Sequence, residues 1–397
     1  MATSQKACSE LERAFVPALA ATLQRYLDSL VAVVSSPAQM EATRRIVHQF
    51  EHGGGSNTQD GKGSRDALGP LLQEKLRLFA SSRDNWVTEL WLDDMYLNNS
   101  QPLPVNSSPF YLLPKQCFAT SADQARFAAR FIECAVLFKK KIDSGTLTPD
   151  VQGRGGTRQP LCMQTYKHFF PAYRRPGPTK DDLLLDTASQ HQDHVIVVCR
   201  DQVPSSVHRK LVSTYESASL RKFYLGRVDN IRAATAQALA WVQAMCDAVP
   251  ATEEDKIQLF LEAVAKGTEI LTYTVNGEGP DNHLLGLREM ARLHETPAPI
   301  FNDKSYADFL HFRLSTSQLA TDKAILVGYG AVVPDGYGCA YNIGADQVSY
   351  CVSSFFSSPE TSSDFFALSL EGSLLQMREL CLKRATQLNM APPPARS

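Results

Sequence analysis

The sequence lacks an excess of either charge and lacks long hydrophobic runs. Its 40 lysine and arginine residues nearly balance 42 aspartate and glutamate residues, which leaves a formal charge of −2. A protein that binds polyanions would carry a basic stripe, so this balance argues against a nucleic-acid partner. No apolar run approaches the roughly 18 residues that cross a bilayer, so we expect no membrane span.

Paired cysteine motifs and a leader-like first segment are also missing. The nine cysteines are odd in number, widely spaced and never arranged as Cys-x-x-Cys. This spacing favours neither a disulfide framework nor a zinc site, and we expect no metal. Glu10, Glu12 and Arg13 stand where a signal peptide needs an unbroken apolar stretch. These features predict a reducing, cytoplasmic location.

What the sequence contains is the pattern of a mixed globular protein, with 44% hydrophobic and 21% charged residues. Apolar residues recur at helical spacing in the segments 16–50, 71–98, 122–142, 235–247, 252–265 and 365–383. Runs rich in β-branched residues predict strands over 194–202, 324–333 and 348–356. The mixture indicates an α/β or α+β fold in two layers.

Three segments receive a structural interpretation and no functional assignment. Residues 51–66 are rich in glycine, but the Gly-Lys-Ser/Thr ending of a phosphate-binding loop is absent, so we predict a surface loop. Lys139 to Lys141 close a predicted helix, where positive charge suits the helix dipole, and we interpret them as solvated. The last residues, 391–397, are predicted to be a disordered tail.

Longer segments resemble the choline/carnitine acyltransferase family and occur in the family's order. They are Asn85 to Pro109, Gln159 to Phe170, Thr214 to Thr235, Asp281 to Glu289, Leu314 to Gln318 and Val332 to Asn342. The resemblance implies a two-domain α/β fold like that of chloramphenicol acetyltransferase, with mixed sheets covered by helices. It also implies transfer of an acetyl group from acetyl-CoA to choline, giving acetylcholine, in a tunnel between the domains.

Such a transfer needs a base for the alcohol proton and a donor for the oxyanion of the tetrahedral intermediate. The resemblance assigns the oxyanion donor to Ser317, the last residue of a Ser-Thr-Ser motif. Without the matching flanks, this tripeptide would be interpreted as a solvated loop or strand edge. For coenzyme A, the resemblance points to Ser217 and Gln318, and the family's lysine-rich segment is not found.

Choline carries a quaternary ammonium group, which aromatic faces hold well. The resemblance implies that Tyr96, Tyr215 and Tyr329 line the choline pocket, although each one taken alone would be interpreted as a core residue. Relatives that act on carnitine have threonine and arginine where this chain has Val228 and Asn282. The pair favours choline, and carnitine stays the alternative acceptor. Asn282 could instead cap a helix that begins near His283.

The family's catalytic histidine has no match among the nine histidines. The resemblance runs to Gln202 and resumes within 205–219, so we predict an internally shortened chain. The predicted domains are 1–202, which lacks its second half, and 203–390. Such a loss exposes sheet edges and apolar surface.

His208, near the junction, is a disfavoured replacement for the missing base. Two hypotheses stay open, an active enzyme that transfers acetyl groups to choline, as the resemblance implies, or an inactive shortened variant, and a monomer is expected.

Overall fold

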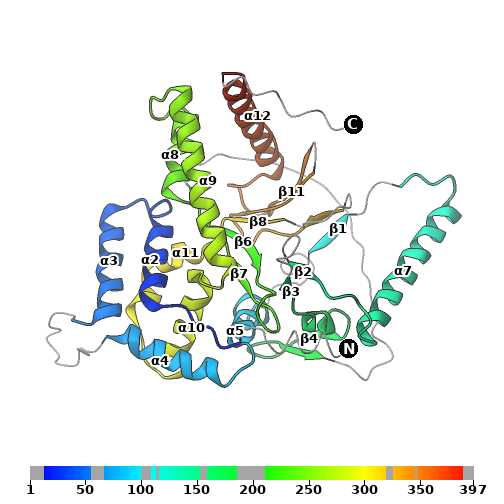
Figure 1. Cartoon of the computed structure of the whole chain (residues 1–397), viewed down its shortest axis with the longest axis horizontal. Coiled ribbons are helices and arrows are strands. Elements are labelled where there is room, and N and C mark those ends of the chain that lie inside the picture. Colours follow the sequence, from blue (N-terminus) through cyan, green and yellow to red (C-terminus); the bar gives the residue numbers. More distant parts are fainter. Residues whose placement is uncertain are drawn as a thin grey trace.

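The structure is a computed structural model that describes residues 13–54, 67–99, 109–112, 116–152, 159–185, 211–318, 325–344 and 347–387. The predicted strand over 194–202, most of the glycine-rich loop and the tail 391–397 lie outside these residues. The described residues form a mixed α/β fold in which a group of helices packs beside a five-stranded sheet (Figure 1).

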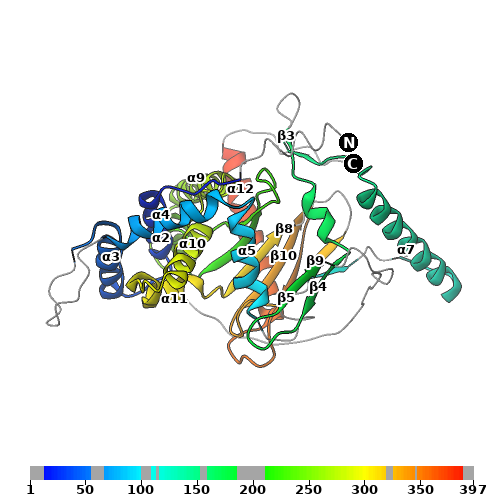
Figure 2. The same ribbon diagram turned by 90° about the horizontal axis from the view of Figure 1, so that it is seen from below.

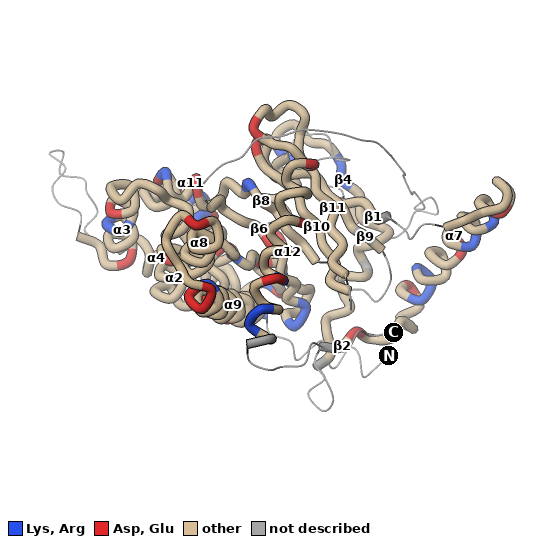
Figure 3. Tube along the Cα trace, turned by 90° about the horizontal axis from the view of Figure 1, so that it is seen from above, with Lys and Arg blue, Asp and Glu red and all other residues tan. Residues whose placement is uncertain are grey.

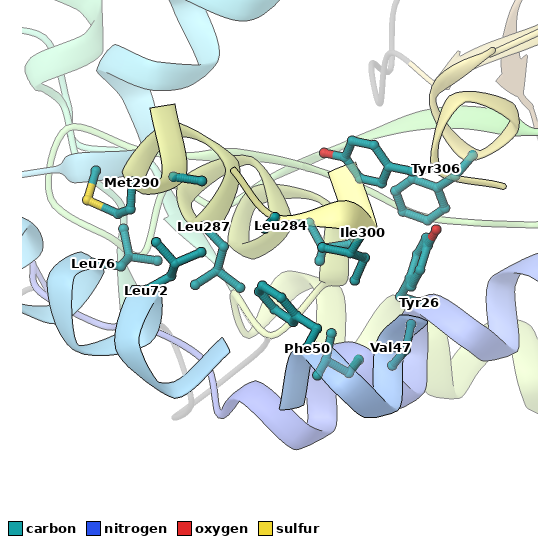
Figure 4. Packing of buried hydrophobic residues seen from close by; sticks show 14 of the residues in the cluster. Tyr26, Val47, Phe50, Leu72, Leu76, Leu284, Leu287, Met290, Ile300 and Tyr306 are labelled. Carbon is teal, nitrogen blue, oxygen red and sulfur yellow. The ribbon is translucent and has the colours of Figure 1, made fainter. Parts of the chain in front are cut away.

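The helical group combines the first and second halves of the chain. Its members are α2 (Leu19–Leu30), α3 (Pro37–His52), α4 (Leu68–Ser81), α5 (Trp86–Leu92), α10 (Pro280–Leu293) and α11 (Lys304–Leu310). Their apolar faces form one buried cluster (Figure 4). Leu284 and Leu287 of α10 are fully buried against Leu72 and Leu76 of α4 and Phe50 of α3. Helix α10 is therefore the centre of this core.

The main sheet is mixed, with strand order β11-β10-β8-β6-β7. Its strands are β6 (Thr214–Ser219), β7 (Val228–Asn230), β8 (Leu314–Gln318), β10 (Tyr337–Ile343) and β11 (Val348–Ser353). β8 pairs in parallel with β6 and β10, and the two outer pairs are antiparallel. A parallel pair needs a crossover connection. For β6 and β8, the helices between β7 and β8 supply this connection.

Three helices accompany the sheet: α8 (Ala236–Met245), α9 (Glu253–Val275) and α12 (Ser363–Gln387). α9 packs against α8, β6 and β7, and α12 packs against β11 (Figure 1). On the view from below, α5 and the β4–β5 hairpin pass in front of the sheet (Figure 2). The small pairs are β1 (Phe110–Leu112) with β9 (Leu326–Gly328), β2 (Val151–Gln152) with β3 (Gln159–Pro160), and β4 (Ala172–Arg175) with β5 (Asp182–Leu185).

Short helical turns complete the described elements: η1 (Asp93–Leu97), η3 (Gln164–His168) and η4 (Pro299–Asn302). Lysine and arginine positions are interspersed with aspartate and glutamate positions over the described chain (Figure 3). The described helices include none that is both long and apolar enough to cross a membrane.

Helix α7 (Ser121–Asp143) stands apart from the rest of the described chain (Figures 1 and 2). It contacts η3, and none of its residues is buried. Phe131, Ile132 and Leu137 expose half or more of their surface, at 51%, 56% and 50%. These side chains form uncovered apolar surface on α7. Lys139 to Lys141 lie at the helix end, as predicted, and Lys139 pairs with Asp143 at 2.7 Å.

Local signals in the sequence located the helices well and their ends less well. The predicted helix over 122–142 is confirmed as α7, which begins with a capping box between Thr120 and Asp123. The predicted start of α9 at Thr252 is also confirmed, but the predicted end at residue 265 is wrong, because the helix continues to Val275. The predicted helix over 71–98 is divided, because Asn85 caps a new helix.

The two described strand predictions in the second half were too long. The strand predicted over 324–333 is limited to β9, and the one over 348–356 ends with β11 at Ser353. The backbone beyond β9 turns away from the ladder, and the bend at Val333 to Gly336 is closed by a backbone hydrogen bond of 3.0 Å.

Two helical glycines give a matched test of the core. At Gly286 of α10 an added Cβ atom would lie 2.6 Å from the Trp86 ring and 2.9 Å from Leu76, whereas at Gly267 of α9 it would meet nothing within 4 Å. Both Gly→Ala changes gain about 1 kcal/mol of helix propensity. We expect Gly267→Ala to raise the free energy of unfolding, and Gly286→Ala to lower it by about 1–3 kcal/mol through overpacking.

Urea denaturation measures both changes. Equal stabilisation by the two variants would contradict the packing described for α10.

Candidate active site

Two parallel strands bring the serines of the predicted active site together. Ser217 lies on β6 and Ser317 on β8, in a register that sets Tyr215 opposite Ser315. Side chains alternate between the faces of a strand, so the serines two residues further along share one face. Their hydroxyl oxygen atoms lie 3.2 Å apart. Ser217 is exposed and Ser317 is half-buried, so the pair is open to a ligand from solvent.

The opposite face of these strands carries a carboxylate that links three strands. One oxygen atom of Glu216 accepts a hydrogen bond from the Tyr341 hydroxyl at 2.6 Å, and the other accepts one from the Thr316 hydroxyl at 3.1 Å. These bonds join β6, β8 and β10. They hold the strand register on which the contact between Ser217 and Ser317 depends.

An aromatic group lies beside the same strands. Tyr96 belongs to the π-helical turn η1, and its ring meets the ring of Trp91 edge to face with centroids 5.1 Å apart. The Tyr215 ring lies 5.3 Å from that of Phe312. Burial raises the pKa of the Tyr215 hydroxyl, Tyr96 raises it further, and a hydrogen bond with Trp91 opposes the rise. Tyr96 and Tyr215 are therefore close together, with Trp91, which the sequence analysis missed.

Tyr329, the third predicted tyrosine, lies just beyond β9. Its hydroxyl donates a hydrogen bond to the backbone oxygen of Ser315 at 3.2 Å, and burial raises its pKa. Ser315 is the residue paired with Tyr215 in the sheet. The structure thus places Tyr329 against the strand that carries Ser317.

Val228 and Asn282, the two positions predicted to select the acceptor, are in direct contact. The side-chain amide of Asn282 donates a hydrogen bond to the backbone oxygen of Val228 at 2.8 Å. The alternative role of Asn282 as a helix cap near His283 is wrong, because α10 begins at Pro280 with Gly279 as its N-cap. The amide of Asn282 instead joins α10 to β7.

A buried ion pair lies beside this contact. The Arg232 guanidinium group binds both carboxylate oxygen atoms of Asp281, at 2.6 and 3.1 Å, and donates to the Phe309 backbone oxygen at 2.8 Å. The Asn230 amide group donates to Asp281 at 3.3 Å, and its oxygen accepts from the Glu216 backbone at 2.9 Å. Sequence reasoning missed Asn230 and Arg232, although both lie in a segment that carried the resemblance.

The start of α5 holds the turn between β6 and β7. Asn85 accepts hydrogen bonds from the first backbone N–H groups of α5, and its amide donates to the backbone oxygen atoms of Tyr224 and Gly226, at 2.9 and 2.5 Å. Gly226 has a φ of 68°, a left-handed conformation that glycine adopts without strain. This connection fixes α5, with Trp91, relative to the strand that carries Tyr215.

The histidine of the Asp-Asn-His segment has a structural role. His283 is fully buried, with its ring nitrogen atoms 2.6 Å from Thr22 Oγ1 and 2.6 Å from Gln73 Oε1. Because the Gln73 amide nitrogen donates to the Pro17 backbone oxygen, its oxygen accepts the Nε2–H of His283, and Nδ1 accepts the Thr22 hydroxyl. The ring is therefore neutral and bound on both sides.

The other described histidines do not take the place of the missing catalytic base. In the described part of the chain, no histidine side chain is hydrogen bonded to Ser217 or Ser317. His52 is exposed at the end of α3. His194 and His208 lie outside the described residues, so the missing base stays a prediction from the sequence.

Metal ligands and disulfides do not contribute to this site as far as it is described. The described residues include no cluster of three or more potential metal ligands, and the described cysteines are free thiols. Gln318 lies exposed at the end of β8, next to Ser317. The polar residues that face solvent here are hydroxyl and amide groups, which suit hydrogen bonding to a neutral or anionic ligand.

Comparison with known proteins identifies the family of this chain. The Choline/Carnitine o-acyltransferase family matches residues 15–203 and 205–372. The chain therefore belongs to the choline/carnitine O-acyltransferase family and is an O-acyltransferase by that membership. The two matched parts meet at residue 204, where the sequence analysis placed the internal shortening.

Among individual relatives, the chain is similar to choline O-acetyltransferases. It is 28% identical to that of *Gallus gallus* over 602 positions, covering 93% of this chain and 92% of the relative. It is 27% identical to that of *Homo sapiens*, covering 94% and 79%, and 25% identical to carnitine O-acetyltransferase of *Mus musculus*, covering 93% of each. The first alignment is longer than the 397 residues of this chain, so the relative has residues without a counterpart here.

The buried His283 predicts an acid-sensitive fold. Burial lowers its pKa to about 3, from an ordinary value near 6.5. Between these values the unfolded chain binds a proton that the folded chain does not, so stability is lost as the pH falls below about 6.5, by up to about 1.4 kcal/mol per pH unit. We expect His283→Gln to flatten this dependence, measured by urea unfolding at about pH 7.5 and about pH 5.

The exposed His52→Gln is the control and should keep the dependence of the unmodified chain. An unchanged slope in His283→Gln would contradict the assignment.

Proposed function

We propose that this chain transfers an acetyl group from acetyl-CoA to choline. The observation that carries the proposal is the group of aromatic and carboxyl side chains at Tyr215. Tyr96 and Tyr215 lie together, and Asp281 is close enough to raise the pKa of the Tyr215 hydroxyl. Aromatic faces with a carboxylate nearby suit a quaternary ammonium group, which cannot donate a hydrogen bond.

The same side chains disfavour an acceptor that carries a carboxylate, as carnitine does. Asn282 is neutral, and its amide is already bound to the Val228 backbone oxygen. The carboxylate of such an acceptor would meet the negative charge of Asp281, and the Arg232 guanidinium group is already paired with that residue. Burying an unpaired carboxylate costs several kcal/mol. Choline does not incur this cost.

In the proposed reaction the choline oxygen atom attacks the thioester carbonyl carbon of acetyl-CoA. The hydroxyl proton passes to a base, the C–S bond breaks, and the thiolate of coenzyme A takes up a proton. The Ser317 hydroxyl donates a hydrogen bond to the oxyanion that forms between these steps. Ser217 and Gln318 flank it and are the proposed contacts for coenzyme A. We assign no residue of this chain as the base.

The proposed architecture is a shortened two-domain acyltransferase fold, with an incomplete first domain in 1–202 and the second in 203–390. The five strands of the main sheet all lie in the second segment. Tyr96 comes from the first segment, whose helices share one core with α10 and α11. The choline end of the site therefore uses both segments, whereas the serine pair uses the second.

A second candidate is a shortened relative that binds the substrates without turnover. The exposure of Ser217 and the partial exposure of Ser317 favour it, because acyl transfer to an alcohol instead of to water needs a site that excludes water. Binding of choline or acetyl-CoA without formation of acetylcholine would support this candidate.

Substitution of the oxyanion donor tests the proposed reaction. We expect Ser317→Ala to lower kcat about 10²- to 10³-fold, because one donor to the oxyanion is lost. Acetylcholine formation from choline and acetyl-CoA is the measurement, and Ser373→Ala on the exposed face of α12 is the control. A folded chain without turnover, or a Ser317→Ala variant of full activity, would refute the proposed reaction.

Substitution at Asn282 tests the choice of acceptor. We expect the unmodified chain to prefer choline over carnitine in kcat/KM by at least about tenfold, since a poorly paired carboxylate costs 1.4 kcal/mol or more. Asn282→Arg should reduce that preference by adding a cation at this position. Gln258→Arg, on the exposed face of α9, adds the same charge elsewhere and should leave the preference unchanged. A preference for carnitine in the unmodified chain would contradict the role of Asn282.

A further inference from the structure

A buried carboxyl group lies between β7 and the first turn of α10. Asp229 is 2% exposed, and its Oδ1 atom accepts the backbone N–H of Asn230 at 2.9 Å. Its Oδ2 atom is buried and has no hydrogen-bond partner among the described residues. Asp229 directly follows Val228, which contacts Asn282. A carboxyl group in this position is costly to bury, so its contacts need an explanation.

Helix α10 has no cap from its own sequence. Its N-cap residue is Gly279, which has no side chain to accept the first N–H groups, and Pro280 follows. Helix starts leave such donors without an intrahelical partner. The backbone N–H of Asn282, in this first turn, is near enough to the Asp229 carboxyl group to lower its pKa. Asp229 is therefore placed to act as the cap from the neighbouring strand.

The packing of Asp229 against the helix start is tight. A Cβ atom at Gly279 would lie 2.5 Å from Asp229 Oδ2 and 2.9 Å from its Cγ atom. Gly279 has a φ of −60°, which any residue adopts, so the backbone does not require glycine here. The absence of a side chain is needed to admit the carboxyl group.

The electrostatic surroundings do not favour an ionised carboxyl group. Burial first, and then the negative charge of Asp281, raise the pKa of Asp229 to about 8. The N–H groups of Asn230 and Asn282 and the Arg227 guanidinium group oppose this rise. A neutral amide of the same shape would therefore serve as a cap equally well, because it keeps one acceptor oxygen and has no charge to bury.

We propose that Asp229 is a positioning residue that fixes the start of α10 against β7 and thereby sets the contact between Val228 and Asn282. The effect of this contact on the choice of acceptor rests on the proposed function, transfer of an acetyl group to choline. Asp229 acts through the backbone of α10, and it holds the helix turn in which Asn282 and Asp281 lie. Loss of its acceptor oxygen loosens that turn, whereas loss of its charge alone does not.

The first test measures the helix start without any substrate. Amide hydrogen exchange of the full chain, resolved at residues 281–283, should become about tenfold faster or more in Asp229→Ala, because a buried donor loses its acceptor. Asp229→Asn should keep the protection of the unmodified chain. Asp303→Ala, before α11, controls for a general loss of stability, since Asp303 binds Thr43 and not α10. Unchanged exchange in Asp229→Ala would overturn the proposal.

A double-mutant cycle tests the contact itself. Gly279→Ala alone should disturb the helix start, because the new Cβ atom meets the Asp229 carboxyl group. The variant that combines Gly279→Ala with Asp229→Ala lacks this clash. The factor by which its amide exchange is accelerated should therefore be smaller than the product of the factors of the two single variants. Multiplicative effects would show that the two residues do not interact and would overturn the proposal.

The effect of Asp229 on binding of the acceptor is tested separately. Asp229→Ala should raise KM for choline, or Kd for choline if turnover is absent, about tenfold, without the same change for acetyl-CoA. Asp229→Asn should restore the choline value, which a merely structural role does not predict. If the unmodified chain binds no choline, the proposed function fails, while hydrogen exchange still decides whether Asp229 positions α10. Altered exchange with an unchanged choline constant would overturn the link to the acceptor.

Discussion

The buried guanidinium group of Arg232 joins the sheet to the helical core, and the rest of the site depends on this junction. Arg232 follows β7, pairs with Asp281 of α10 and stacks over the Phe309 ring at 3.2 Å. It also donates to Ser213 at 3.0 Å, just before β6. One side chain therefore positions two strands and two helices. A buried ion pair of this kind adds little net stability, but removal of one partner is costly because a charge stays unpaired.

The site that results has two ends joined by one strand. β6 carries Tyr215 toward the aromatic group and Ser217 toward solvent, two residues apart on the same face. The aromatic end is half-buried, since Trp91, Tyr96 and Tyr215 are each partly covered, and this strengthens cation binding relative to an exposed site. The serine end is open, which admits a large ligand and also admits water. In the proposed function, choline recognition rests on several contacts at the aromatic end, whereas oxyanion stabilisation rests on Ser317 and its one hydroxyl neighbour.

Prediction from the sequence was good where local signals decide the structure. The helices carried their own periodicity and caps, such as Thr252 with Asp255, so they were located without the fold. Strands β6 and β8 were missed as strands because TYESAS and LSTSQ are polar and lack an apolar alternation. Their pairing in the sheet, not their hydrophobicity, makes them strands. The positions of Ser217, Ser317 and Tyr215 came from resemblance in these same segments.

The sequence by itself determined the residue types of the site, the order of its segments, the near-neutral charge and the place of the internal shortening. The tertiary structure alone decided that Asn282 binds Val228 and that His283 is buried as a neutral core residue. It also decided that α7 leaves Phe131 uncovered. The physical reason is distance along the chain: caps and periodicity act within a few residues, whereas these contacts join segments that only the packed core brings together.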